Sequence, residues 1–308
     1  MKKKIVSAVL CAAVCLGMLA GCGQSSTSGE IPDSKKEDSK TAAEKSGGTA
    51  AKKSSKLDVK LDKDKLVVAP IIDYEPFSFK EDGEWKGYNI DIWKEFEKRT
   101  GIPVEWYELN KETIEKWSSD VSMSYPQIVM MEGMADVDVY TWEISPSAFE
   151  EADDTIEQTE PIYYSGITLA VAADDSIQEM SDISGDVEVN AGEEMHAFDI
   201  EETLKNVNSK IYVGRWTGVY GYDKLSQLKA GDPPLALLDI EAKYAMKKDK
   251  GLNIRLLEPV GYAVGCPRVF EKNTADAVNI FLQSIKEDGT LKEISEKWFG
   301  QDVSVERK

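Results

Sequence analysis

The sequence predicts an α/β fold in which helices cover a parallel sheet. The run KLVVAP at residues 65–70 is apolar and β-prone, which is typical of a strand buried on both faces. Residues 88–100 then carry apolar residues at helical spacing, and Gly101 follows where such a helix would end. VEWY at residues 104–107 predicts another strand. This alternation of strands and helices favours a parallel sheet.

The later segments continue the alternation through a second α/β unit. We also expect a turn at residues 81–83, before the first helix, and later a helix ending at residues 128–131 and a strand through Val137 and Val139. Further strands are expected at residues 167–172, 187–189, 211–213, 235–239 and 261–266. Helices are expected after the short strand ending at Val189 and at residues 222–230, and two amphipathic helices separated by Gly289 close the chain. A chain of 308 residues is long enough for two domains.

The composition is that of a soluble, acidic, globular protein. The formal net charge is −19, and 42% of the residues are hydrophobic. Such a charge disfavours nucleic acid as a partner, because phosphates must be neutralised by Lys and Arg. It would instead raise the local concentration of cations. The sequence suggests no metal or redox site, and we expect no cofactor.

Residues 1–21 read as a lipoprotein signal peptide. Three lysines precede a short apolar core, and Leu-Ala-Gly precedes Cys22. The core is too short to span a membrane, and the pattern resembles a lipobox, in which the cysteine is lipidated. An ordinary secretory signal is the alternative. Cys11 and Cys15 lie in this signal, so Cys266 is the remaining thiol, and its apolar setting indicates a core position rather than a nucleophile.

Residues 22–64 comprise the lipidated cysteine and a tether. The tether is rich in Ser, Lys, Asp, Gly and Ala and has almost no large apolar residues. It cannot bury enough surface to offset the entropy of ordering the chain, so we expect disorder. The segment would hold the globular body off a membrane, and a partner-binding tail is the alternative.

Residues 135–148, ADVDVYTWEISPSA, combine three features. The valines at the start indicate a buried strand, and Ser145-Pro146 is typical of a helix start. Residues 140–143 between them are expected to form a polar and aromatic loop. Ligands of open α/β sheets bind at the carboxyl ends of strands, so this loop is predicted to form one wall of a small-molecule site. An ordinary connection between strand and helix is the alternative.

Five segments in this order resemble family 3 solute-binding proteins, which capture amino acids and related polar solutes for ABC importers. They are KLVVAPIIDYEPFSF, GYNIDIWKEFEKRTGIPVEW, MEGMADVDVYTWEISP, QLKAGDPPLALLDIEA and ADAVNIFLQSIKEDGTLKEISEKWFG, of which the last is the most specific. The resemblance runs from about residue 65 to residue 300.

The resemblance implies a two-lobe periplasmic-binding-protein-like fold of type II. Its lobes are joined by two hinge strands and close over a ligand in the cleft between them. Lobe 1 would comprise residues 65–165 plus 262–308, and lobe 2 residues 166–261. The hinge crossings would fall near residues 164–165 and 260–261.

The resemblance also implies which residues line the cleft. Tyr74 takes the place of the family's ligand-packing aromatic residue, with Phe77 beside it, and a position on the rim is the alternative. Asp239 matches the carboxylate that accepts the ligand's ammonium. The full set of expected ligand-binding residues is Tyr74, Phe77, Tyr140, Thr141, Trp142, Glu143, Glu193, Glu194, Trp216 and Asp239.

Two departures from the family pattern concern the ligand's carboxylate. Ala148 stands where amino-acid-binding members place an arginine, which pairs bidentately with a carboxylate. Glu193 and Glu194 stand where hydroxyl groups are usual. The ammonium partner is kept and the carboxylate partners are lost, so we expect a cationic ligand without an α-carboxylate, such as a polyamine or quaternary amine. Two alternatives stay open: the glutamates face solvent, or Arg215 supplies a displaced clamp for a polar or basic amino acid.

These features predict an extracytoplasmic substrate-binding lipoprotein of an ABC importer. It would be a monomer anchored to the cell membrane by lipid, with the importer's membrane subunits as partners. We expect no enzymatic activity, because the sequence offers no nucleophile–base pair, and His196 is interpreted as a surface residue. The alternatives are a dehydratase-like enzyme that uses cleft carboxylates on the same fold, and a ligand-sensing binding protein.

Overall fold

A computed structural model describes residues 56–71, 74–108, 137–146, 156–189, 197–216 and 224–306. All of them belong to one compact unit, Lys53–Lys308. The expectations for the signal peptide, for Cys22, for residues 23–55 of the tether and for the helix ending at residues 128–131 lie outside the described residues. The expectation of disorder was wrong for residues 56–64, because Leu57, Val59 and Leu61 pack against the core and the Leu57 N–H donates to the Arg99 carbonyl oxygen at 2.9 Å.

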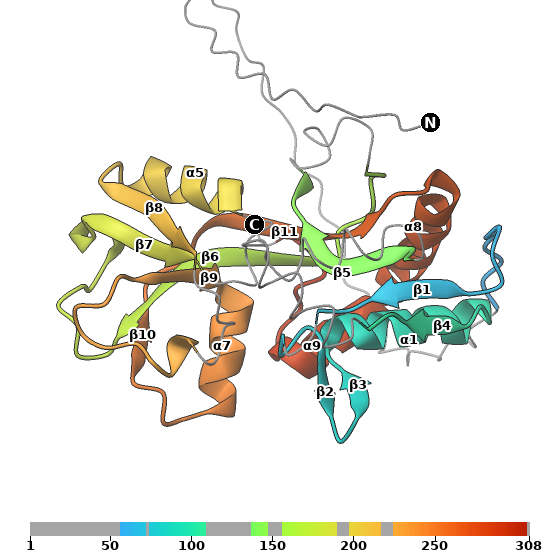
Figure 1. Cartoon of the computed structure of the whole chain (residues 1–308), viewed down its shortest axis with the longest axis horizontal. Coiled ribbons are helices and arrows are strands. Elements are labelled where there is room, and N and C mark those ends of the chain that lie inside the picture. The colour runs from blue at the N-terminus through green and yellow to red at the C-terminus, as the bar shows by residue number, and fades with distance from the viewer. Residues whose placement is uncertain are drawn as a thin grey trace, which may run out of the picture. The chain divides into compact units, whose positions relative to one another are not determined.

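Strands and helices alternate along the body, as the sequence predicts (Figure 1). In chain order the elements are β1 (Leu66–Ala69), β2 (Phe79–Glu81), β3 (Glu84–Lys86), α1 (Tyr88–Thr100), β4 (Val104–Trp106), β5 (Val139–Ile144), β6 (Tyr163–Ala172), the 3-10 helix η1 (Met180–Asp182), β7 (Gly185–Val189), α5 (Ala197–Val207), β8 (Ile211–Trp216), β9 (Leu235–Leu238), α7 (Asp239–Lys248), β10 (Ile254–Leu256), β11 (Val260–Val269), α8 (Lys272–Glu287) and α9 (Thr290–Phe299).

The main sheet consists of two parallel blocks joined by two long antiparallel strands. Its order is β4-β1-β5-β11-β6-β9-β7-β8, and β10 pairs with β6. Pairing is parallel within β4-β1-β5 and within β9-β7-β8. Strand β11 pairs with β6 through residues 260–265 and with β5 through residues 266–269. This is the two-lobe type II arrangement, with β6 and β11 in the hinge position. The exact lobe boundaries stay a prediction.

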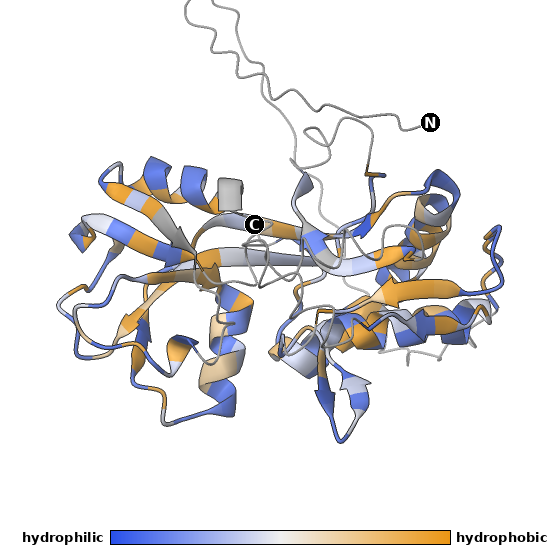
Figure 2. Cartoon of the chain, viewed as in Figure 1, coloured by the Kyte–Doolittle hydropathy of each residue, from blue (hydrophilic) through white to orange (hydrophobic). Residues whose placement is uncertain are grey.

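Local sequence explains the elements that position the first block. All four residues of β1 are buried, as expected for a strand covered on both faces. Helix α1 buries Ile92, Trp93 and Phe96, and Gly101 ends it in the left-handed conformation with its N–H 2.8 Å from the Glu97 carbonyl oxygen. Figure 2 shows the resulting pattern, with apolar residues along β1 and alternating apolar and polar residues on α5.

The expected loop at residues 140–143 is instead part of β5, and this prediction was wrong. Tyr, Thr, Trp and Ile favour extended structure, and β5 is paired on one side with β1 and on the other with β11. The polar residues are buried within the strand rather than released into a loop. The segment that was predicted to line a site is therefore a strand.

Other elements extend the expectations or differ from them. The turn at residues 81–83 belongs to the hairpin β2–β3, whose two turn residues Asp82 and Gly83 both have positive φ, 53° and 81°. Helix α7 and strand β10 had no counterpart among the expected elements. The helix expected at residues 222–230 does not reach Ala230. Its described part ends at Leu225, ahead of Gly231 and the pair Pro233-Pro234, which disfavour helix.

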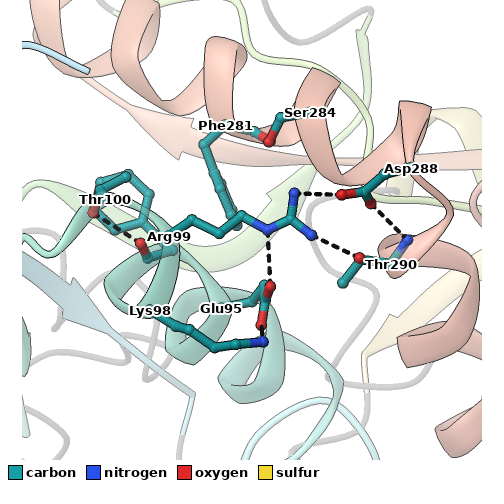
Figure 3. Close-up of polar contacts among 9 residues, drawn as sticks. Glu95, Lys98, Arg99, Thr100, Phe281, Ser284, Asp288 and Thr290 are labelled. Atoms are coloured by element: carbon teal, nitrogen blue, oxygen red, sulfur yellow. Dashed lines mark hydrogen bonds and ion pairs between the residues drawn. The ribbon is translucent and has the colours of Figure 1, made fainter. Parts of the chain in front are cut away.

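The two closing helices are fastened to α1 by polar contacts (Figure 3). Arg99 lies near the end of α1 and its side chain is 8% exposed. Its guanidinium donates to Glu95 at 2.8 Å, to Asp288 at 2.7 Å and to the Thr290 hydroxyl at 2.7 Å. Asp288 directly follows α8 and Thr290 begins α9, so one side chain joins segments that are far apart in the sequence.

Cys266 is a core residue, as predicted. It is 1% exposed, and burial raises the pKa of its thiol to about 12, so it stays protonated and unreactive at neutral pH. Within the described ranges, no group of three or more His, Cys, Asp or Glu side chains is placed to hold a metal ion. None of the helices in this part of the chain is long and apolar enough to cross a membrane.

Candidate functional site

The structure describes the side chains of six of the ten predicted ligand-binding residues. These are Tyr74, Phe77, Tyr140, Thr141, Glu143 and Asp239. Trp142 lies in β5 and Trp216 in β8, but their side chains are outside the described residues, as are Glu193 and Glu194. Ala148, His196 and the side chain of Arg215 also lie outside them.

Tyr74 stands in the loop after β1 and is held by its own backbone. Its N–H donates to the Ser78 carbonyl oxygen at 2.8 Å, and the Phe77 N–H donates to the Tyr74 carbonyl oxygen at 2.9 Å. The rings of Tyr74 and Phe77 stack with their centroids 4.9 Å apart. Phe77 is fully buried against Tyr88, Tyr163 and Phe299, so it supports Tyr74 from the core. Direct contact of Phe77 with a ligand stays a prediction.

The Tyr74 hydroxyl reaches the second block of the sheet. It donates to Glu241 Oε2 at 3.3 Å, in the first turn of α7. Glu75, the next residue, also contacts α7. The Tyr244 hydroxyl donates to Glu75 Oε1 at 2.5 Å, and Lys248 pairs with the same carboxylate. The loop after β1 and helix α7 therefore meet at this edge of the sheet. Sequence reasoning missed Glu241, although its place two residues after Asp239 was a signal.

Strand β5 contributes buried polar groups. Tyr140 is 1% exposed, its ring lies edge-on to Phe270 at 5.6 Å, and burial raises its pKa to about 12, so the phenol is neutral. Within the described ranges, the Tyr140 hydroxyl and the Thr141 Oγ1 make no hydrogen bond. The Thr141 carbonyl oxygen accepts from Asn89 Nδ2 at 3.2 Å, which ties β5 to the start of α1.

Sequence reasoning also missed a buried cation, Arg268. It lies in β11 opposite Tyr140 and is 1% exposed. Burial lowers the pKa of its guanidinium to about 10, while interactions with Tyr140 and Glu143 oppose that fall. Glu143 is itself only 3% exposed. Glu143 therefore has a buried cation within interaction range. A lone arginine in the apolar segment of β11 was the signal that could have revealed it.

Asp239 begins α7 directly after β9, at the carboxyl end of that strand. It is 4% exposed, and its Oδ2 accepts from Lys243 Nζ at 2.6 Å. Its Oδ1 makes no hydrogen bond within the described ranges. Asp239 lines a hollow of about 500 Å³ at the hinge strands. The other lining residues are Gly166, Lys243, Leu256, Leu257, Glu258, Pro259, Gly261 and Tyr262.

The hollow is open to a small solute at a point where both hinge strands pass. Gly166 belongs to β6, and Gly261 and Tyr262 belong to β11. An alanine Cβ at Gly166 would lie 2.8 Å from the Pro259 side chain and 3.7 Å from Asp239 Cβ, so the glycine keeps this corner clear. The arrangement offers a buried acid, an adjacent ammonium and the half-exposed Tyr262 ring.

Comparison with known proteins identifies the family of this chain. The model of bacterial extracellular solute-binding proteins, family 3, matches residues 66–301. The chain belongs to this family. Family 3 members are extracellular or periplasmic proteins that bind solutes, so a solute-binding role follows for this chain.

Curated relatives match along most of their length. The chain is 25% identical over 241 residues to the "Probable amino-acid-binding protein YxeM" of Bacillus subtilis, which covers 76% of this chain and 83% of the relative. It is 26% identical over 240 residues to the "L-cystine-binding protein TcyA" of the same organism, which covers 75% of this chain and 80% of the relative.

Solved structures show the same fold. A substrate-binding protein of an amino acid ABC transporter has a TM-score of 0.56 at 20% identity, covering 77% of this chain and 99% of its own. An ABC uptake transporter binding protein from Streptococcus pneumoniae, solved with bound histidine, has a TM-score of 0.58 at 18% identity, covering 79% and 95%.

Proposed function

We propose that this protein is the extracytoplasmic binding component of an ABC importer and captures a small ammonium-bearing solute, an amine or an amino-acid-like compound, by lobe closure. The observation that carries this proposal is the buried carboxylate of Asp239. Its Oδ1 is buried and makes no hydrogen bond within the described ranges, which is costly unless a donor arrives, and the residue borders a hollow. A ligand ammonium supplies both the donor and the opposite charge.

The contacts across the hinge support binding by closure. Tyr74 and Glu75 come from the loop after β1, and their partners Glu241, Tyr244 and Lys248 come from α7. The hollow beside Asp239 is lined by no described residue of the loop after β1, so a solute there would act on these contacts through α7, whose start it would occupy. Its binding energy would then favour the closed arrangement over the open one. Aromatic faces such as the Tyr74 ring attract an ammonium by about 0.5–2 kcal/mol.

The preference for a cation without a carboxylate is a finer part of the proposal. Two resident cations reduce the acidic surplus on which it rests, because Lys243 pairs with Asp239 and Arg268 interacts with Glu143. The remaining support is the replacement of the family's arginine by Ala148 and of its hydroxyl loop by Glu193-Glu194. The names of the curated relatives support an amino acid instead, so both ligand classes belong in the test.

The test is a thermal-shift screen of the purified protein with arginine, glutamine, cystine, putrescine and choline. We expect at least one ammonium-bearing compound to raise the melting temperature, because a ligand that binds only the folded state stabilises it by mass action. Asp239→Asn should lose that shift. Asp276→Asn is the matched control, since Asp276 is an exposed acid on α8 with the same i,i+4 lysine pairing. If no compound shifts the wild-type protein, or if Asp239→Asn keeps the full shift, the proposal is wrong.

Three further parts of the proposal concern anchoring, activity and assembly. We propose that Cys22 carries lipid and tethers the body to the membrane, that the protein binds its ligand unchanged, and that it acts as a monomer. Replacing Cys22 with Ser should release the protein from the membrane fraction into the medium. Chromatography of each stabilising compound after long incubation should recover it intact. Conversion into a product would favour the dehydratase-like alternative.

A further inference from the structure

The carboxylate that we propose for the ligand already holds an ammonium. Lys243 lies one turn beyond Asp239 on α7, and its Nζ is 2.6 Å from Asp239 Oδ2. The Asp239 side chain is 6% exposed, whereas that of Lys243 is 48% exposed. The pair thus joins a buried, fixed acid to a cation on a flexible and half-exposed stem. Both residues line the same hollow of about 500 Å³.

We propose that Lys243 is a resident competitor that occupies part of the Asp239 carboxylate until a ligand ammonium displaces it. This inference rests on the proposed function and adds a residue that determines affinity. The Lys243 ammonium and a ligand ammonium carry the same charge and the same kind of N–H donor, so they compete for the same oxygens. Displacement requires only a rotation of the lysine stem towards solvent, where an ammonium is well hydrated.

The expected effect on affinity follows from the strength of the pair. Ion pairs of this i,i+4 spacing are weak when both partners are exposed, and stronger when one partner is buried and the bond is charge-assisted. Removal of the competing ammonium should therefore tighten the binding of an ammonium compound by about 2- to 10-fold. A ligand carboxylate could instead use Lys243 as its partner, in which case removal of the lysine would weaken binding.

The experiment uses the full-length protein and methylammonium chloride, the simplest probe with the ammonium chemistry of the proposed ligands. Binding is followed by thermal shift against potassium chloride at equal ionic strength, in the wild type, Lys243→Gln and the double variant Asp239→Asn/Lys243→Gln. Lys272→Gln is the matched control, because Lys272 pairs with Asp276 at the same i,i+4 spacing on an exposed helix surface.

The competitor role predicts that Lys243→Gln binds methylammonium about 2- to 10-fold more tightly than the wild type. Lys272→Gln should match the wild type, and the double variant should lose the gain. Equal, weaker or undetectable binding in Lys243→Gln would overturn the inference. The solute screen keeps the two claims apart. A compound that stabilises the wild type but binds Lys243→Gln no more tightly contradicts the competitor role alone, whereas the absence of any shift in either protein contradicts the proposed function.

Discussion

Replacing Arg99 with Met should lower the free energy of unfolding by about 2–3 kcal/mol. The substitution keeps the apolar stem and removes three charge-assisted hydrogen bonds, to Glu95, Asp288 and Thr290 (Figure 3). Breaking a buried pair costs about 3–5 kcal/mol, and exposed pairs contribute about 0–1 kcal/mol. The Asp288 side chain is 39% exposed, so solvent screening places this cluster between those limits.

Urea denaturation followed by tryptophan fluorescence measures this loss, with an unchanged dependence of the unfolding free energy on urea. Lys98→Met is the control, because Lys98 also pairs with Glu95 but its side chain is 69% exposed, and its loss should stay below about 0.5 kcal/mol. Should Arg99→Met lose less than about 0.5 kcal/mol, the view that Arg99 fastens α1 to α8 and α9 is wrong.

The same cluster gives a pH dependence. Burial by itself would raise the pKa of Asp288, but hydrogen bonds from Arg99 and Thr290 outweigh it, and the pKa of this carboxyl lies below its ordinary value of 3.8. A carboxyl with a lowered folded-state pKa stabilises the protein fully above its unfolded-state pKa. Its contribution is lost as the pH falls through the folded-state pKa, below 3.8. Arg99→Met should remove this part of the acid dependence.

Three other substitutions or treatments test the core and the site. Gly87→Ala should prevent soluble folding or cost about 3 kcal/mol or more, as measured by urea denaturation, because Gly87 has φ 133° and an added Cβ would lie 2.1 Å from the Phe77 carbonyl oxygen. Cys266 should react with a thiol reagent only after denaturation, since its pKa is raised to about 12 and it is 1% exposed; rapid labelling of the native protein would contradict this. Arg268→Met should cost about 3–5 kcal/mol by leaving Glu143 buried without that cation, and the double variant with Glu143→Gln should regain part of the loss.

The buried arginine of β11 changes how the charge of the site is understood. From the sequence, Glu143, Glu193, Glu194 and Asp239 are expected at the site, with Arg215 as the candidate base. In the structure Glu143 has Arg268 within interaction range, and Asp239 has Lys243. The net charge of −19 therefore says little about the local field at Asp239. Ligand preference depends on which of these ion pairs a solute can displace, because nearby buried charges contribute more to the local field than distant charges that solvent and salt screen.

The amino-acid sequence by itself determined the elements whose causes are local. The apolar run of β1, the apolar face of α1 with Gly101 as its stop, and the closing helices on either side of Gly289 follow from spacing and conformational preference. The order of these segments was also enough to indicate the family.

Only the tertiary structure decided the features that depend on distant partners. Residues 140–143 became part of a strand because β11 pairs with β5 from Val139 to Ile144, while β1 pairs with Val139 and Tyr140 on the other side. Tyr74 reached Glu241, which is 167 positions further along the chain, and Arg268 was buried opposite Tyr140. The local sequence can mark such residues, as it does Glu241 and Arg268, but it does not identify their partners, since the hydrogen bonds and charges that stabilise them come from segments that meet only when the whole sheet has assembled.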